Sequence, residues 1–170
     1  MAALLALLMT SAPANAADRC AGAHARHGKK PAKVHRAVMC LVNAERRERG
    51  LAPLRGQKRL RTAARRHSRD MTRRRYFDHI SPDGRSMVDR ARRVHYVTAR
   101  ASWRLAENIA WGMASRATPA ATVRSWMRSP GHRSNILDAG MREAGVGVAL
   151  RTPSGDARGA TYTMLFGRRG

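Results

Sequence analysis

Apolar residues recur at helical spacing in four stretches of the chain. The first stretch ends at Gly50, a residue type common just past a helix C-terminus. Two later stretches begin with capping signals, because Ser86 with Asp89 resembles a capping box and Thr118 precedes Pro119 as an N-cap. The apolar positions that predict the four helices are Val34, Val38, Leu41 and Val42; Leu60, Ala63, Ala64 and Met71; Met87, Ala91 and Val94; and Val123, Trp126 and Met127.

The C-terminal third changes from helical to strand-like spacing. Ser129 and Pro130 restart a shorter helix, and two apolar runs follow at residues 144–150 and 160–166. The turn-rich residues 152–159 join these runs, which predicts a hairpin with a long loop. Helices followed by antiparallel strands predict one domain of the α+β class.

The N-terminus has the features of an export signal. Residues 2–9 form an apolar run that is too short to span a bilayer, and Ala14-Asn15-Ala16 fits a small-residue cleavage site. We therefore predict a signal peptide over residues 1–16, cleavage after Ala16, and a secreted protein with no transmembrane segment. A buried N-terminal helix is the alternative. Residues 17–33 then form a flexible basic segment that precedes the domain at residues 34–170.

The two cysteines, Cys20 and Cys40, agree with export. In an oxidising compartment, two cysteines most simply form one disulfide. The bond would tie the polar N-terminal segment to the first predicted helix. The alternative is a metal site that combines these cysteines with His24, His27 or His35.

The charge is unusual, because 34 Lys and Arg residues face 11 Asp and Glu residues, for a formal net charge of +23. Such a charge could indicate a polyanion-binding protein. Only four of the 34 are lysine, however, and the arginines are spread along the whole chain, as a codon-composition bias would produce. This pattern favours loose attraction to anionic cell-envelope polymers over nucleic acid as the partner.

Three polar residues stand out because the usual catalytic motifs, such as GxSxG and HExxH, are absent from the sequence. They are His79, Glu107 and His132, and each lies in a short segment rich in turn residues or helix-start signals. Two imidazoles and a carboxylate could bind a divalent cation, with Zn²⁺ favoured over Ca²⁺. They could equally form a hydrogen-bonded acid–base cluster, or each satisfy its local backbone.

A series of short motifs follows in order along the chain. They are Cys40-Leu-Val-Asn-Ala-Glu-Arg46, Arg65-Arg-His-Ser-Arg-Asp-Met71, Phe77-Asp-His-Ile-Ser-Pro-Asp-Gly84, Ala106-Glu-Asn-Ile-Ala110, Trp126-Met-Arg-Ser-Pro-Gly-His-Arg-Ser-Asn-Ile-Leu137, Val146-Gly-Val148 and Tyr162-Thr-Met-Leu-Phe-Gly167. Together they resemble the CAP superfamily (cysteine-rich secretory proteins, antigen 5, pathogenesis-related 1) in its bacterial SCP-like form. The resemblance covers residues 36–167 and implies an α-β-α sandwich with a small antiparallel sheet between helical layers.

The resemblance also implies a ligand-binding cleft lined by two histidines and two acidic residues. By motif, His79, Glu107 and His132 match three of the four positions. The fourth, normally a glutamate, is Ser129 here, either a cleft residue or only a helix N-cap. Asn108 is expected to serve the backbone near Glu107. Arg133 and Asn135 either shape the cleft or cap the short helix.

The resulting expectation is a monomeric, secreted binding module that takes a cell-envelope component, a lipid or a small ligand. One alternative is a metal-assisted hydrolase that uses His79, Glu107 and His132. A second alternative is a cationic polyanion-binding protein. His67, Trp111 and Trp126 are expected in the core rather than in a site.

Overall fold

The structure is a computed structural model that describes residues 19–25 and 31–170. The predicted signal peptide therefore lies outside the described residues. The elements in chain order are α1 (Pro31–Arg47), β1 (Arg55–Gly56), α2 (Lys58–Arg74), α3 (Met87–Arg92), β2 (Trp103–Met113), the 3₁₀ helix η1 (Ala114–Ala117), α4 (Pro119–Arg128), α5 (Pro130–Leu137), β3 (Glu143–Ala149) and β4 (Gly159–Arg169).

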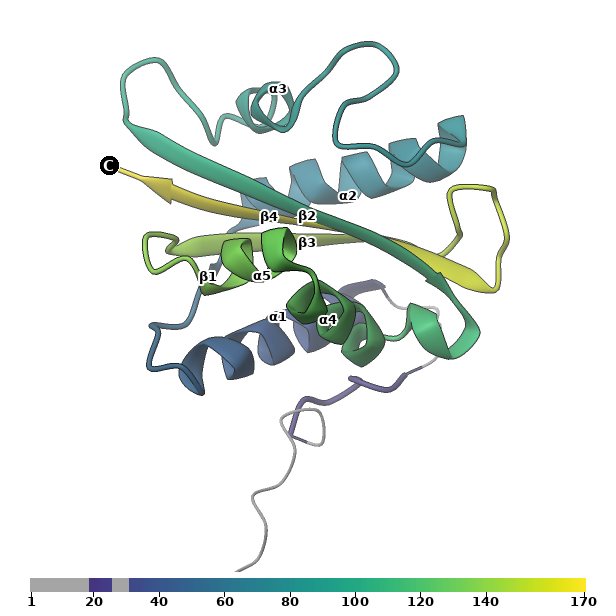
Figure 1. The fold of residues 1–170 in the computed structure, drawn as a ribbon. Helices are drawn as coiled ribbons and strands as arrows, with labels where there is room; N and C mark the ends of the chain where they lie inside the picture. Colours follow the sequence, from purple (N-terminus) through teal and green to yellow (C-terminus); the bar gives the residue numbers. More distant parts are fainter. Residues whose placement is uncertain (1–18, 26–30) are drawn as a thin grey trace, which may run out of the picture.

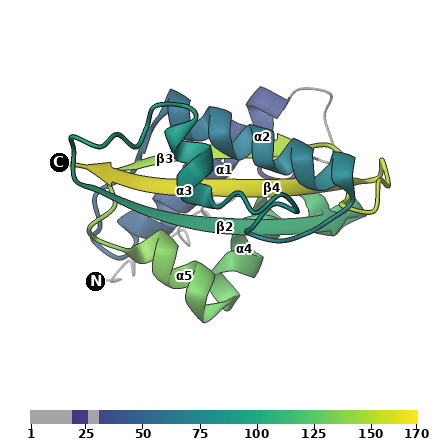
Figure 2. The same cartoon turned by 90° about the horizontal axis from the view of Figure 1, so that it is seen from above.

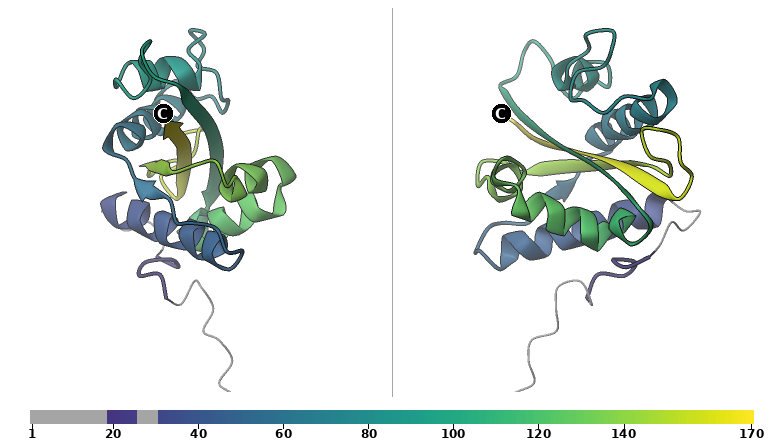
Figure 3. Two further views of the ribbon diagram at one scale, coloured as in Figure 1. Left: turned by 90° about the vertical axis from the view of Figure 1, so that its left-hand side faces the viewer. Right: turned by 45° about the vertical axis from the view of Figure 1, so that its right-hand side comes forward.

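The elements form three layers, with one sheet in the middle (Figure 1). Helices α2 and α3 cover one face of the sheet, and α1 and α4 cover the other, with α5 beside α4 (Figures 2 and 3). The strand order is β1-β3-β4-β2. The β2–β4 and β3–β4 pairs are antiparallel, whereas β1 runs parallel to β3, so the predicted antiparallel sheet is in fact mixed.

The predicted helix starts are confirmed. Ser86 and Asp89 form a reciprocal capping box at α3, and the Thr118 side chain accepts a hydrogen bond from the Ala121 backbone at α4. These bonds satisfy donors that the first turn of a helix otherwise leaves free. Within the described residues, no helix is long and apolar enough to cross a membrane.

Strand β2 is the longest of the elements that the sequence pattern does not predict; the short β1 and η1 are the others. Its burial does not alternate: the first residues are exposed, three consecutive residues from Glu107 to Ile109 are buried, and Trp111 is exposed again. A strand with one regular buried face has a period of two, and this strand has none. It nevertheless pairs along its whole length with β4, and this pairing fixes the position of Glu107.

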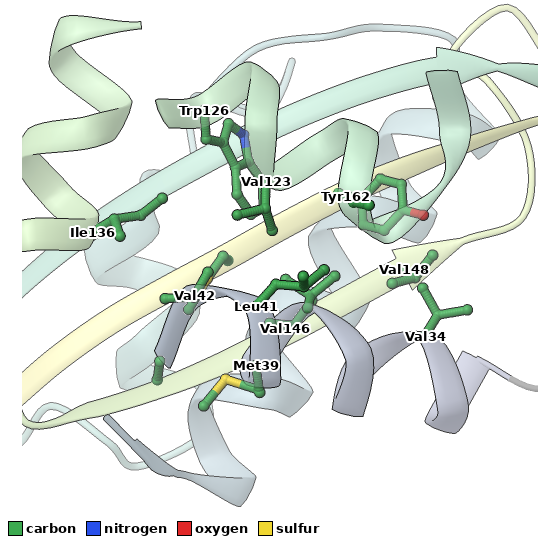
Figure 4. Packing of buried hydrophobic residues seen from close by; sticks show 14 of the residues in the cluster. Val34, Met39, Leu41, Val42, Val123, Trp126, Ile136, Val146, Val148 and Tyr162 are labelled. Atoms are coloured by element: carbon green, nitrogen blue, oxygen red, sulfur yellow. The ribbon is translucent and has the colours of Figure 1, made fainter. Parts of the chain in front are cut away.

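The main core lies between the sheet and helices α1 and α4. Val42 of α1, Val123 and Trp126 of α4, and Val146 of β3 are all at most 3% exposed and pack together (Figure 4). Trp126 therefore occupies the core, as predicted. A smaller cluster under α2 and α3 includes Leu60, Tyr96 and Leu165.

Two glycines let α2 lie directly on β3. A Cβ added at Gly145 would overlap the backbone of α2 at Leu60 and Arg61, and one at Gly147 would overlap the next turn at Ala64 and Arg65. Ser68 of α2 donates to the carbonyl oxygen of Gly147 at 3.2 Å. The glycines therefore set the distance between this helix and the sheet.

The predicted disulfide between Cys20 and Cys40 is present, with a Cα–Cα distance of 5.7 Å. Both sulfurs are used in this bond, so these cysteines do not form the alternative metal site with nearby histidines. The Ala120 backbone N–H at the start of α4 also donates to the carbonyl of Ala23 at 2.9 Å. Residues 19–25 are thus attached to both α1 and α4.

The outer edge of the sheet is formed by β2, whose neighbour on the inner side is β4. Trp126 Nε1 donates to the Ile109 carbonyl at 3.1 Å, and Asn135 Nδ2 donates to the Glu107 carbonyl at 3.3 Å. Side chains from α4 and α5 therefore occupy backbone acceptors that an edge strand would otherwise leave open.

Candidate functional site

Glu107, at the middle of β2, is the centre of the predicted site. Its side chain is only 2% exposed. Nη2 of Arg90, from α3, lies 3.0 Å from Oε1 and 2.8 Å from Oε2. His79 Nδ1 lies 2.8 Å from Oε1. Because a buried carboxylate needs a partner for its charge, Arg90 is what allows Glu107 to be buried as an anion.

Arg90 is a site residue that the sequence does not single out. It is 7% exposed, and besides Glu107 it donates to the carbonyl of Arg85 at 3.0 Å and to that of His79 at 2.9 Å. Its Nε is buried without a partner in the described part of the chain. Arg90 therefore joins α3, the loop that carries His79, and β2.

His79 is the accessible member of the site, with a side chain that is 50% exposed. Because a carboxylate only accepts hydrogen bonds, Nδ1 of His79 carries the proton that it donates to Glu107. This hydrogen bond is the main reason why the pKa of His79 is raised, and burial opposes it. With Nδ1 engaged by Glu107, Nε2 is the ring nitrogen left for a ligand.

His67, from α2, lies behind the carboxylate. It is buried in the core, as expected, and its Nε2 donates to the carbonyl of Asp78 at 3.0 Å. The same nitrogen lies 3.9 Å from Glu107 Oε1. Burial lowers the pKa of His67 to about 4, so the ring is neutral at neutral pH. His67 thus lies against Glu107 on the core side as a neutral ring. Its residue type and spacing predicted burial in the core but not this position beside the site.

His132 and two asparagines attach α5 to the site. Asn108 Nδ2 donates to the carbonyl of His132 at 3.0 Å, and Asn135 Nδ2 donates to Asn108 Oδ1 at 2.9 Å. The pKa of His132 is lowered, first by burial and then by the charge of His79. The two imidazoles are therefore near enough to interact electrostatically. The Asn108 side chain thus donates to the backbone of α5 and not to that of β2, the strand that carries Glu107.

Ser129 occupies the junction between α4 and α5, at the N-cap position of α5. Its side chain makes no capping hydrogen bond. It is also not among the residues that line the cleft beside Glu107. At the position that carries an acidic group in the resembling family, the Ser129 side chain therefore adds neither a negative charge nor a capping hydrogen bond.

The predicted zinc ligands do not form a ready ligand set. Within the described residues, no three His, Cys, Asp or Glu side chains are grouped in a way that could hold a metal ion. Both oxygens of Glu107 are already bonded to Arg90. A metal ion held by His79, Glu107 and His132 would therefore have to compete with Arg90 for the carboxylate, and the three-ligand metal site stays a prediction.

A cleft of about 450 Å³ opens beside His79 and Glu107. Its apolar lining comes from Ile80, α3 and β2, and its polar lining includes His79 and Glu107. Its size lies within the usual range for small-ligand sites, which combine apolar walls with a few polar groups. The lining residues are His79, Ile80, Ser86, Met87, Val88, Leu105, Ala106, Glu107 and Asn135.

We expect the three histidines of the site to titrate in a fixed order. His79 should take up a proton above pH 6.5, because Glu107 stabilises the charged ring. His132 should protonate below pH 6.5, and His67 only near pH 4. NMR titration of the imidazole resonances measures all three. In Glu107→Gln the pKa of His79 should fall, and an unchanged value would show that this hydrogen bond does not set it.

Comparison with known proteins agrees with the motifs and the fold. A family model for the cysteine-rich secretory protein family (CAP) matches residues 39–166. YkwD, an uncharacterised protein of Bacillus subtilis (strain 168), is 42% identical over 112 residues, or 65% of this chain and 40% of that protein. The chain thus spans less than half the length of this relative.

Solved structures with the same fold include proteins from outside the cell. An extracellular protein containing an SCP domain from Bacillus anthracis str. Ames is 26% identical, with a TM-score of 0.65 over 82% of this chain and 44% of that chain. An outer surface protein of Borrelia burgdorferi shares the fold at 17% identity, with a TM-score of 0.66 over 78% of this chain and 90% of that chain. The chain belongs to the CAP, or cysteine-rich secretory protein, family.

Proposed function

We propose that this protein is an extracellular binding module whose cleft at His79 and Glu107 takes a ligand with an apolar body and a polar head. The observation that carries the proposal is the pairing of the buried Glu107 with both Arg90 and His79. A carboxylate fixed in this way orients His79 but is poorly placed to accept a further proton. The arrangement favours binding over catalysis.

The walls of the cleft support this choice of ligand. Ile80 is 48% exposed at its rim, and Met87 and Leu105 line it. A lone exposed apolar residue is ordinary on a protein surface, whereas several around one hollow favour an apolar ligand. His79 and Asn135 stand in the same cleft and offer hydrogen bonds to a polar head.

A fluorescent fatty acid, cis-parinaric acid, tests the proposal by titration against the purified protein. Ile80→Asp should weaken binding by about tenfold or more, because burying an isoleucine side chain contributes about 1.5–3 kcal/mol. His79→Ala should also weaken binding, through loss of the polar contact. Circular dichroism should show that both variants keep the native fold.

Met113→Asp is the matched control, because Met113 is also an exposed apolar residue and lies at the far end of β2. It should bind the probe like the unmodified protein. Equal affinities for all variants would contradict a site at this cleft. Failure of the unmodified protein to bind the probe would contradict an apolar ligand body.

A further inference from the structure

We propose a second binding site, separate from the cleft, in which Trp111 and three arginines bind an acidic glycan. The site is a groove of about 410 Å³ between α4, the end of β2 and η1. It shares none of its lining residues with the cleft beside Glu107. The groove is lined by Ala110, Trp111, Ser115, Arg116, Ala121, Thr122, Arg124, Ser125 and Arg128.

Trp111 is the first observation. The sequence predicts it in the core, yet it is 49% exposed, whereas Trp126 on α4 is 1% exposed. Tryptophan is the largest apolar side chain, and a half-exposed one keeps much of its indole in contact with water. The C–H face of a pyranose ring can cover such a surface while its hydroxyls stay hydrated. Trp111 is thus a suitable stacking platform for a sugar.

The arginines are the second observation. Arg116, Arg124 and Arg128 line the groove, and no acidic residue does. In the described part of the chain these three side chains have no hydrogen-bond or ion-pair partner. Arg124 and Arg128 are also four residues apart on α4, a spacing at which like charges repel. A bound anion would relieve this repulsion.

The arginines of this groove differ from several others on the surface, which have carboxylate partners. Several other arginines are paired with neighbouring carboxylates, as Arg85 is with Asp83 at 2.6 Å and Arg73 with Asp70 at 3.0 Å. Here three arginines line one groove together with Trp111 and the exposed serines Ser115 and Ser125. Guanidinium groups bind carboxylates and phosphates, and hydroxyls match sugar hydroxyls.

An acidic glycan fits this combination better than a nucleic acid does. Proteins that bind single strands stack successive bases on several aromatic side chains, and this groove has one. The extracellular location proposed above also favours a polysaccharide over intracellular nucleic acid as the partner, and in this respect the inference rests on the proposed function. A sugar ring on Trp111 would place its acidic groups beside the arginines.

Calorimetry with hexagalacturonate, an acidic hexasaccharide, tests the proposal. The purified protein should bind this probe, and neutral galactohexaose at least tenfold more weakly. Trp111→Ala should lose at least tenfold in affinity. Trp103→Ala is the matched control, since Trp103 is also exposed on β2 at 39% but lies at its other end. It should bind within twofold of the unmodified protein.

The double variant Arg124→Gln/Arg128→Gln should also lose at least tenfold, whereas Arg47→Gln/Arg59→Gln removes the same charge from exposed sites elsewhere and should stay within twofold. Equal losses in both double variants would overturn the site in favour of diffuse charge attraction. Tighter binding of hexathymidylate than of hexagalacturonate would overturn the glycan. Absence of hexagalacturonate binding by the unmodified protein would overturn both the site and the acidic glycan as its ligand. Trp111→Phe, which keeps a smaller ring, should give an intermediate loss.

Discussion

Replacing Arg90 by methionine should lower the free energy of unfolding by about 3–5 kcal/mol, because it leaves the buried carboxylate of Glu107 without its main partner. Arg90 and Glu107 have side chains that are 7% and 2% exposed, so water cannot take the place of the lost contact. Urea denaturation followed by circular dichroism measures the change. His79 alone, half exposed, is a weak substitute for the guanidinium.

A matched double variant separates the lost charge pair from lost packing. In Arg90→Met/Glu107→Gln both charges are removed, and much of the stability should return, since replacing a buried pair by neutral groups is often close to neutral. Arg85→Met is the exposure control, because Arg85 pairs with Asp83 in a partly exposed position, and it should change stability by at most about 1 kcal/mol. A loss of less than 1 kcal/mol in Arg90→Met would contradict the central role given to this residue.

Gly147→Ala should destabilise the protein by at least about 3 kcal/mol, at the upper end of what an added methyl group does in a packed core. The new Cβ would overlap the backbone of α2 at Ala64 and Arg65, and a backbone cannot turn aside as a side chain can. Helix α2 would have to move away from the sheet and take His67 with it. The midpoint of urea denaturation is the measurement.

Gly131→Ala is the control for this substitution. Gly131 lies in α5, and a Cβ there has nothing within 4 Å. Alanine in a helix is favoured over glycine by about 0.5–1 kcal/mol, so this variant should be as stable as the unmodified protein or slightly more stable. If Gly147→Ala also left the free energy of unfolding unchanged, this would contradict the close packing of α2 on β3.

Sequence patterns predicted the helices well because their signals are local. The apolar stripe of α2 and the caps at Ser86 and Thr118 depend only on residues within a few positions of each other. Strand β2 was missed for the opposite reason. Which of its side chains are buried depends on α3, α4 and α5, which come from distant parts of the chain.

In the candidate site too, local motifs could be recognised in the sequence, whereas burial set by distant elements could not. The motif resemblance indicated that His79 and Glu107 belong together, and the structure places them in direct contact. Arg90 could not be singled out, because in a sequence so rich in arginine nothing marks the one that a fold will bury. Trp111 was misplaced because its residue type favours the core, whereas its exposure is decided by its place near the end of an edge strand.

The side chains that hydrogen-bond to the outer carbonyls of β2 protect the protein against aggregation. An unprotected edge strand of eleven residues is a template on which a second chain can add by backbone pairing. Trp126 and Asn135 obstruct such pairing at Ile109 and Glu107, in the middle of the strand. Partial unfolding that detaches α4 and α5 would therefore uncover a growth surface for fibres, even while β3, β4 and α2 stay folded. Resistance to self-association thus depends on two short helices that contribute no strand to the sheet.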